Sequence, residues 1–244
     1  MRYISWFSAG CSSFVAAYLM RDKLTDCIYI DIADQHPDSM RFVHDAEKML
    51  GCEIQIIRSE KFASVDDAIT KTRYVNGVGG ATCTDRLKRK VREAWEKEHG
   101  ITREDVYIWG FDCTKHERER AHKTMSRMTY VDHEFPLIDA NLTKEDVHAM
   151  CEDLGIKRPA MYDLGYPNNN CIGCVKGGMG YWNKIRVDFP EVFALRAKRE
   201  REIGHSCIKG VFLDELDPEA GRNEVIVPSC SIMCQLAEMD MEAA

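Results

Sequence analysis

Short apolar runs alternate with amphipathic stretches along the first 110 residues of the chain. Four apolar runs predict buried strands, at residues 3–7, 27–32, 53–57 and 106–110. The stretches between them predict helices, at residues 13–20, 38–50, 63–72 and 84–99. Strands that alternate with helices predict a parallel sheet with right-handed crossovers. The pattern therefore predicts an α/β fold with a doubly wound, mostly parallel sheet.

The pattern continues with a helix at 115–127 and then changes after residue 137. Further helices are predicted at 143–154 and 190–203, and the first has Thr143 as a candidate N-cap. Residues 158–183 contain two prolines, three consecutive asparagines and several glycines, which indicates a loop. We therefore place a domain boundary near residue 140. It separates an α/β core at 1–140 from a cysteine-bearing extension at 141–244.

Length and charge narrow the class of protein. At roughly 150 residues per domain, 244 residues favour one large domain with an appendage over two equal ones. Lys and Arg total 33 against 40 Asp and Glu, and the net charge of −7 argues against binding nucleic acid through bulk positive charge. The chain lacks a membrane-length apolar run, and its start lacks a signal-peptide core, so we expect a cytoplasmic protein without membrane attachment.

Cysteine is the unusual residue, because 11 in 244 is about 4.5%, below the level of a disulfide scaffold. In a reducing compartment, clustered thiols indicate a metal, an iron–sulfur cluster or redox chemistry. Cys171 and Cys174 form a Cys-x-x-Cys turn, which brings two sulfurs to one centre, and Cys230 and Cys234 lie together in the tail. With Cys83 at the carboxyl edge of the predicted sheet, four such thiolates would complete a tetrahedral zinc site or a [4Fe–4S] site. Reduced thiols without a metal are the alternative.

The first loop, Ser8-Ala9-Gly10-Cys11-Ser12-Ser13, joins the first strand to the first helix. In an open parallel sheet, ligands bind outside the carboxyl ends of the strands, and a loop rich in Gly and Ser offers N–H groups and hydroxyls to phosphate. The alternative is a tight turn in which Ser12 or Ser13 only caps the helix. The loop matches neither the Walker A pattern nor Gly-x-Gly-x-x-Gly.

This loop resembles the PP-loop of the phosphoadenosine phosphosulfate (PAPS) reductase and ATP pyrophosphatase superfamily, the adenine nucleotide alpha hydrolases. The pyrophosphatase form reads Ser-Gly-Gly-x-Asp-Ser, whereas Ala9 here replaces its first glycine and Ser12 its aspartate. PAPS reductases also lack that aspartate. Residues 31–38 are similar to the family's Asp-Thr-Gly-x-x-x-Pro-Glu-Thr, and residues 83–88 to its Cys-Thr-x-x-Leu-Lys. The block at 168–182 is similar to PAPS-reductase-like proteins, many of them encoded by phages and bacteria.

The resemblance implies an adenine nucleotide, either ATP or PAPS and adenosine phosphosulfate, at the carboxyl edge of the sheet. Asp31 would then accept a hydrogen bond from a ribose or a substrate amine. Gly110, Glu117 and Arg120 loosely match the family's Gly-x-Arg-x-x-Glu-Ser-x-x-Arg, which predicts a phosphate contact for Arg120. The full set of expected nucleotide-binding residues is Ser8, Ala9, Gly10, Cys11, Ser12, Ser13, Asp31, Lys88 and Arg120.

The resemblance also implies roles for the cysteines. Assimilatory sulfonucleotide reductases and DNA phosphorothioation members of the superfamily carry a [4Fe–4S] cluster on comparable cysteines, which favours iron–sulfur over zinc. The reductases' Glu-Cys-Gly-Leu-His segment aligns Cys230 with the cysteine that attacks the sulfate sulfur, although its neighbours differ. Cys83 is a second catalytic candidate, because a helix N-terminus and Lys88 would lower the pKa of its thiol. The expected cluster ligands are Cys83, Cys171, Cys174 and Cys234.

Three functions follow as hypotheses. The first is sulfonucleotide reduction, in which Cys230 attacks the substrate and a thioredoxin-like donor resolves the product. The second is an ATP-dependent sulfurtransferase acting on nucleic acid, held locally by the basic residues of 86–92. The third is a non-catalytic nucleotide-binding module with structural zinc. A homodimer is compatible with each.

Overall fold

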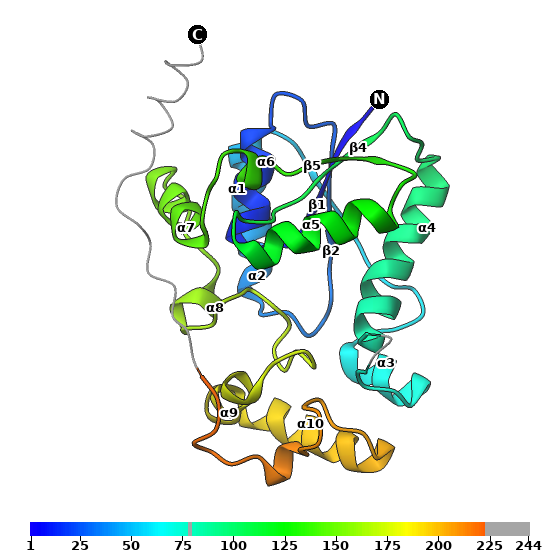
Figure 1. The fold of residues 1–244 in the computed structure, drawn as a ribbon, viewed down its shortest axis with the longest axis vertical. Coiled ribbons are helices and arrows are strands. Elements are labelled where there is room, and N and C mark those ends of the chain that lie inside the picture. Colours follow the sequence, from blue (N-terminus) through cyan, green and yellow to red (C-terminus); the bar gives the residue numbers. More distant parts are fainter. Residues whose placement is uncertain (78–79, 223–244) are drawn as a thin grey trace.

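The computed structural model describes residues 1–77 and 80–222, and its centre is a five-stranded parallel sheet (Figure 1). The strand order is β3-β2-β1-β4-β5, and each neighbouring pair is parallel. The predicted doubly wound, mostly parallel sheet is therefore confirmed. The strands are β1 (Tyr3–Phe7), β2 (Asp26–Ile30), β3 (Ile54–Ile57), β4 (Val106–Ile108) and β5 (Asp132–Glu134).

Helices cover both faces of the sheet. Successive side chains of a strand point to opposite faces, so a strand whose side chains are all apolar needs a cover on each face. One face packs against α1 (Cys11–Leu19) and α2 (Asp38–Leu50) in a core that includes Phe7 and Phe42. The other face carries a smaller core with Ile4, Trp95 of α4 (Lys90–His99), and Met128, directly after α5 (Lys115–Arg127). Both faces are buried, which explains why the central strands read as continuous apolar runs.

The segment after β5 extends the first core. Short helix α6 (Pro136–Asp139) and α7 (Lys144–Asp153) both pack on α1. The predicted capping box of α7 is present: Asp146 N donates to Thr143 Oγ1 at 3.2 Å and Thr143 N donates to Asp146 Oδ2 at 2.8 Å. Packing of α7 on α1 brings the extension next to the first loop of the sheet.

A second core lies beyond the carboxyl ends of β2 and β3. Figure 1 places α9 (Met179–Asp188) and α10 (Pro190–Ile203) at the end of the molecule away from the N-terminus, with α3 (Val65–Thr72) nearby. These helices share buried Ile69, Trp182 and Ile185. Two further short elements are α8 (Ala160–Asp163) and a 3₁₀ turn at Leu213–Glu215.

Local structure departs from the sequence prediction in two places. Residues 158–183 were predicted as a loop but contain α8 and the start of α9, because Trp182 and Ile185 lie three apart on one buried helical face. The predicted helix at 84–99 begins as a π-helix at Thr84–Arg89 before α4. Such π segments are rare and are frequently found at functional sites. Among the helices of the described residues, none is long and apolar enough to span a bilayer.

The start of the chain is fixed by Asp105, and its loss should be measurable. The Asp105 carboxylate is buried and accepts from the Arg2 backbone N at 3.0 Å, from Arg2 Nη2 at 2.7 Å and from Thr102 N at 3.0 Å. We expect Asp105→Asn to lower the free energy of unfolding by about 2 kcal/mol at pH 7. The side-chain hydrogen bond from Arg2 holds the pKa of Asp105 well below its usual range.

The pH dependence of that effect has a definite sign. Because the folded-state pKa is lowered, the stabilisation is present above the unfolded pKa of about 4 and is lost as the pH falls below it. Urea unfolding should therefore show a gap between wild type and Asp105→Asn at pH 7 that shrinks toward pH 3. Exposed Asp22→Asn is the matched control, with no expected change. An equal gap at both pH values would contradict this account.

Candidate functional site

The loop between β1 and α1 is held in shape by its own hydrogen bonds. The Ser13 hydroxyl is buried, accepts from Ser8 N at 3.1 Å and from Ser8 Oγ at 3.0 Å, and donates to the Gly10 carbonyl at 2.9 Å. Ala9 adopts a left-handed backbone with φ of 55°. Ser13 thus supports the loop from inside, whereas Ser8 and Ser12 remain partly or fully accessible.

A cavity of about 240 Å³ lies at this loop. The loop follows β1, and β1 is flanked by β2 and β4, whose connections run in opposite directions. This is the topological switch point of the sheet, the place where open α/β folds bind ligands. The cavity is lined by Ser8, Gly10, Ser12, Ser13, Gln35, Lys88, Gly110, Asp112, Glu117, Arg120, Lys144, Tyr162, Asn168, Asn169 and Asn170.

The segment directly after β4 is in close contact with the loop. A Cβ atom at Gly110 would lie 2.7 Å from the Ser12 carbonyl carbon and oxygen and 2.7 Å from the Ser13 Cα. A glycine is therefore required here for close approach of two backbones. This backbone contact fixes the position of the loop relative to β4 at the switch point.

The cavity has three cations and two acids. Arg120 Nη1 pairs with Glu117 Oε2 at 3.1 Å, and its guanidinium lies 4.3 Å from the centre of the Phe111 ring. Lys144 Nζ donates to Asn168 Oδ1 at 2.8 Å, and burial lowers the pKa of Lys144. Together with Lys88 these side chains give the cavity a net positive charge against Asp112 and Glu117, which suits a phosphate.

The extension contributes residues that the sequence analysis did not assign to this site. Lys144 begins α7, and Asn169 Nδ2 donates to the Ala9 carbonyl at 2.6 Å and to Ser39 Oγ at 3.0 Å. Asn169 Oδ1 is buried without a hydrogen-bond partner. The three consecutive asparagines were visible as a polar block, but only folding shows that they face the first loop.

Two other residues predicted to bind the nucleotide, Asp31 and Cys11, do not line the cavity. Asp31 does not line the cavity and instead pairs with Arg58, Oδ2 to Nη2 at 2.5 Å. The Cys11 side chain is buried in the first core beside Cys151 and His148. The neighbouring Cys151 and, to a smaller extent, His148 lower the pKa of the Cys11 thiol, and the interaction with Cys11, together with burial, raises the pKa of the Cys151 thiol. The predicted roles of Asp31 and Cys11 stay predictions.

The cysteine-bearing turn lies in the second core. Gly173, in the left-handed region with φ of 73°, lets the chain reverse between Cys171 and Cys174. The Tyr181 hydroxyl accepts from Cys174 N at 2.8 Å and donates to the Cys171 carbonyl at 3.0 Å. Ile172 N donates to the Asp34 carbonyl at 2.8 Å, which ties the turn to the loop after β2.

Cys83 joins this region at the start of the π-helix. It packs against the second core, which contains Cys171, and its thiol interacts electrostatically with that of Cys174. Burial raises the pKa of Cys83, so the expected lowering was wrong: desolvation outweighs the charge of Lys88. Within residues 1–77 and 80–222, no three His, Cys, Asp or Glu side chains are already arranged to hold a metal ion. Cys230 and Cys234 lie outside the described residues.

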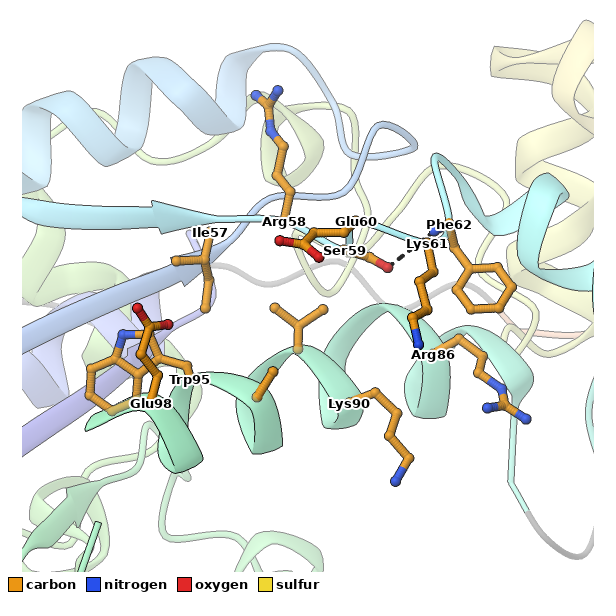
Figure 2. A pocket seen from close by; sticks show the side chains of 12 residues that line it. Ile57, Arg58, Ser59, Glu60, Lys61, Phe62, Arg86, Lys90, Trp95 and Glu98 are labelled. Carbon is orange, nitrogen blue, oxygen red and sulfur yellow. Dashed lines mark hydrogen bonds between the residues drawn. The ribbon is translucent and has the colours of Figure 1, made fainter. Parts of the chain in front are cut away.

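A larger groove of about 620 Å³ lies between the end of β3 and α4 (Figure 2). Ile57 and Trp95 form its apolar end, and Ser59 Oγ accepts from Phe62 N at 3.2 Å. Its charged lining comprises Arg58, Glu60, Lys61, Arg86, Lys90 and Glu98. Arg86 and Lys90 line this groove, and Lys88 between them lines the smaller cavity, so the helical segment at 86–90 borders both the groove and the cavity.

The phosphoadenosine phosphosulfate reductase domain model matches residues 2–177, most of the chain. The chain belongs to this family. The matched region contains the first loop, all five strands and the Cys171–Cys174 turn. A solved PAPS reductase from Candida auris, in complex with phosphate, is similar over 67% of this chain and 78% of that chain, with 16% identity and a TM-score of 0.48. No curated protein matches the chain.

Proposed function

We propose that this member of the PAPS reductase family binds an adenine sulfonucleotide at the β1–β4 switch point and reduces its sulfate group. The observation that carries the proposal is the cavity beside the PP-loop, with Ser8 and Ser12 at one wall and Lys88, Arg120 and Lys144 around it. Loop N–H groups at a helix N-terminus and cationic side chains together recognise phosphate. Ser12 stands where ATP-cleaving relatives have aspartate, which favours a sulfonucleotide over ATP.

The reduction would use a cysteine nucleophile. In the proposed step, the Cys230 thiolate attacks the sulfate sulfur, forms an S–S bond and releases the adenosine phosphate. A thiol of a thioredoxin-like donor then attacks the cysteine sulfur and releases sulfite, and its second thiol closes the donor's disulfide. The two donor thiols supply the two electrons that reduce the sulfate.

Cys83, Cys171 and Cys174 suit a thiolate-bound group, and we propose a [4Fe–4S] cluster, with zinc as the second candidate. The fit rests on the donor atoms and on Arg196, which is 2% exposed and whose Nε and Nη1 have no hydrogen-bond partner. A buried cation of this kind favours a nearby anion. When bound, the cluster would supply a fixed charge centre close to the nucleotide site.

Anaerobic turnover tests the proposal. PAPS or adenosine phosphosulfate, with a dithiol donor, should yield sulfite and adenosine phosphate in equal amounts, and Cys230→Ser should stop the reaction. Cys52→Ser, half-buried in the first core, is the matched control and should keep activity. Binding of both nucleotides without turnover would reject the reductase and leave the nucleotide-binding module.

A second candidate is ATP-dependent sulfur transfer to nucleic acid. The groove in Figure 2 favours it, because Arg58, Lys61, Arg86 and Lys90 outnumber Glu60 and Glu98 along its wall. Pyrophosphate release that requires added RNA or DNA would support this function. It should weaken when Lys61 and Lys90 are both changed to glutamate.

A further inference from the structure

Tyr162 is an aromatic residue among the polar residues that line the cavity beside the PP-loop. It belongs to α8, which is fixed to the start of α2: Ala160 N donates to Asp38 Oδ2 at 2.8 Å, and Arg41 Nη2 donates to the Arg158 carbonyl at 3.1 Å. The Asp38 carboxylate also holds Arg41, Oδ1 to Nε at 2.7 Å. The backbone that carries Tyr162 is therefore held in place before any ligand binds.

The ring of Tyr162 is held in place as well. His148 of α7 packs against it edge to face, with the ring centres 4.5 Å apart and the planes at 82°. His148 follows Lys144 by one helical turn, so the helix face that brings Lys144 to the cavity also supports the Tyr162 ring. Tyr162 is 6% exposed and belongs to the first core. Packing on this side leaves the ring little freedom to move away from the loop.

The hydroxyl of Tyr162 reaches the PP-loop at Gly10. A Cβ atom at Gly10 would lie 3.1 Å from the Tyr162 oxygen and 3.6 Å from Ser8 Oγ. The backbone of Gly10 is extended, with φ of −115°, which any residue can adopt. Space for the Tyr162 hydroxyl, rather than backbone conformation, therefore favours glycine at this position. Ser8, Gly10 and Tyr162 all line the cavity.

The protonation of this hydroxyl makes it a hydrogen-bond donor. Burial raises the pKa of Tyr162, so the phenol keeps its proton at neutral pH. Backbone hydrogen bonds from Cys11 and Asn169 act in the opposite direction, which means that these two N–H groups are directed at the phenol oxygen. The proton is then left for an acceptor on another side of the oxygen. An anionic oxygen in the cavity is an acceptor of this kind.

We infer that the Tyr162 hydroxyl donates a hydrogen bond to a phosphate oxygen of the ligand, and that Gly10 leaves room for this hydroxyl at the PP-loop. This inference rests on the nucleotide site of the proposed function and adds a neutral donor to its three cations. A hydroxyl donates in one direction, whereas an ammonium group attracts an anion as a point charge. Tyr162 therefore orients the phosphate group, and Lys88, Arg120 and Lys144 supply the charge.

Calorimetric titration of the full chain with adenosine 3′,5′-bisphosphate and with adenosine tests this contact. Tyr162→Phe removes one oxygen and keeps the ring, so we expect about tenfold weaker binding of the bisphosphate and unchanged binding of adenosine. The matched control is Tyr18→Phe, because Tyr18 is half-buried against the first core and does not line the cavity. This control should bind both compounds as wild type does.

The outcomes separate the inference from the proposed function. If wild type and Tyr162→Phe bind the bisphosphate equally well, the inference fails and the nucleotide site stands. Equal losses of bisphosphate and adenosine affinity would also overturn the inference, because Tyr162 would then only support the loop. Wild-type protein that binds neither compound would reject the nucleotide site, and the inference with it.

A double-mutant cycle tests the contact between Gly10 and Tyr162 without any ligand. Gly10→Ala should lower the midpoint of urea unfolding in wild type, because the new Cβ meets a hydroxyl that its packing holds in place. The same change should lower the midpoint by less in Tyr162→Phe, where that oxygen is absent. Equal shifts in the two backgrounds would count against the inference. The unfolding curves also establish that each variant folds.

Discussion

Replacing Gly110 with alanine should weaken binding of a phosphate-bearing adenine nucleotide by about 10- to 100-fold. The added Cβ would lie 2.7 Å from backbone atoms of Ser12 and Ser13. Backbone cannot rotate away as a flexible side chain can, so either the first turn of α1 or the end of β4 must move. Both movements displace the N–H groups that would hold phosphate.

A second glycine controls for the general cost of this substitution. A Cβ at Gly178 would meet no atom within 4 Å, and its backbone is extended with φ of −80°. Calorimetric titration with adenosine 3′,5′-bisphosphate should show nearly unchanged affinity for Gly178→Ala and a large loss for Gly110→Ala. Equal affinities for the two variants would mean that the loop does not hold the phosphates.

The sequence predicted the parts of the molecule in which local pattern and tertiary structure agree. The apolar runs of the central strands were readable because both faces of the sheet are buried. Strand β5 escaped prediction because it has three polar residues, Asp132–Glu134, and pairs only at the edge next to β4. The start of α9 was hidden by its glycines, although Trp182 anchors it in the second core.

The sequence predicted mainly the part of the candidate site that is formed by one contiguous loop, residues 8–13. Residues 8–13 directly follow the first strand, so their position in the sequence is enough to place them at the carboxyl edge of the sheet. Lys144 and Asn169 are more than 130 residues away in sequence, and no motif connects them to the loop. The packing of α7 on α1 brings Lys144 to the loop, and Asn169 is held there by its hydrogen bond to the Ala9 carbonyl.

Changing Lys144 to methionine should weaken nucleotide binding about 10- to 100-fold while leaving adenosine affinity unchanged. Methionine keeps the apolar length of the side chain and removes the charge, so packing at the start of α7 is preserved. Lys97→Met, exposed on α4 away from the cavity, is the matched control. Equal losses for adenosine and its bisphosphate would show that Lys144 positions the loop rather than the phosphate.

The pH profile provides a separate test of the same residue. Burial lowers the pKa of Lys144, so in the free protein its cation is lost at a lower pH than that of an ordinary lysine. Phosphate binds the cation, and affinity should therefore decline as the pH rises through that lowered pKa. Lys144→Arg, whose guanidinium stays charged, should keep its affinity over the same range, whereas Lys144→Met should be weak throughout. A wild-type profile as flat as that of Lys144→Arg would remove Lys144 from the phosphate site.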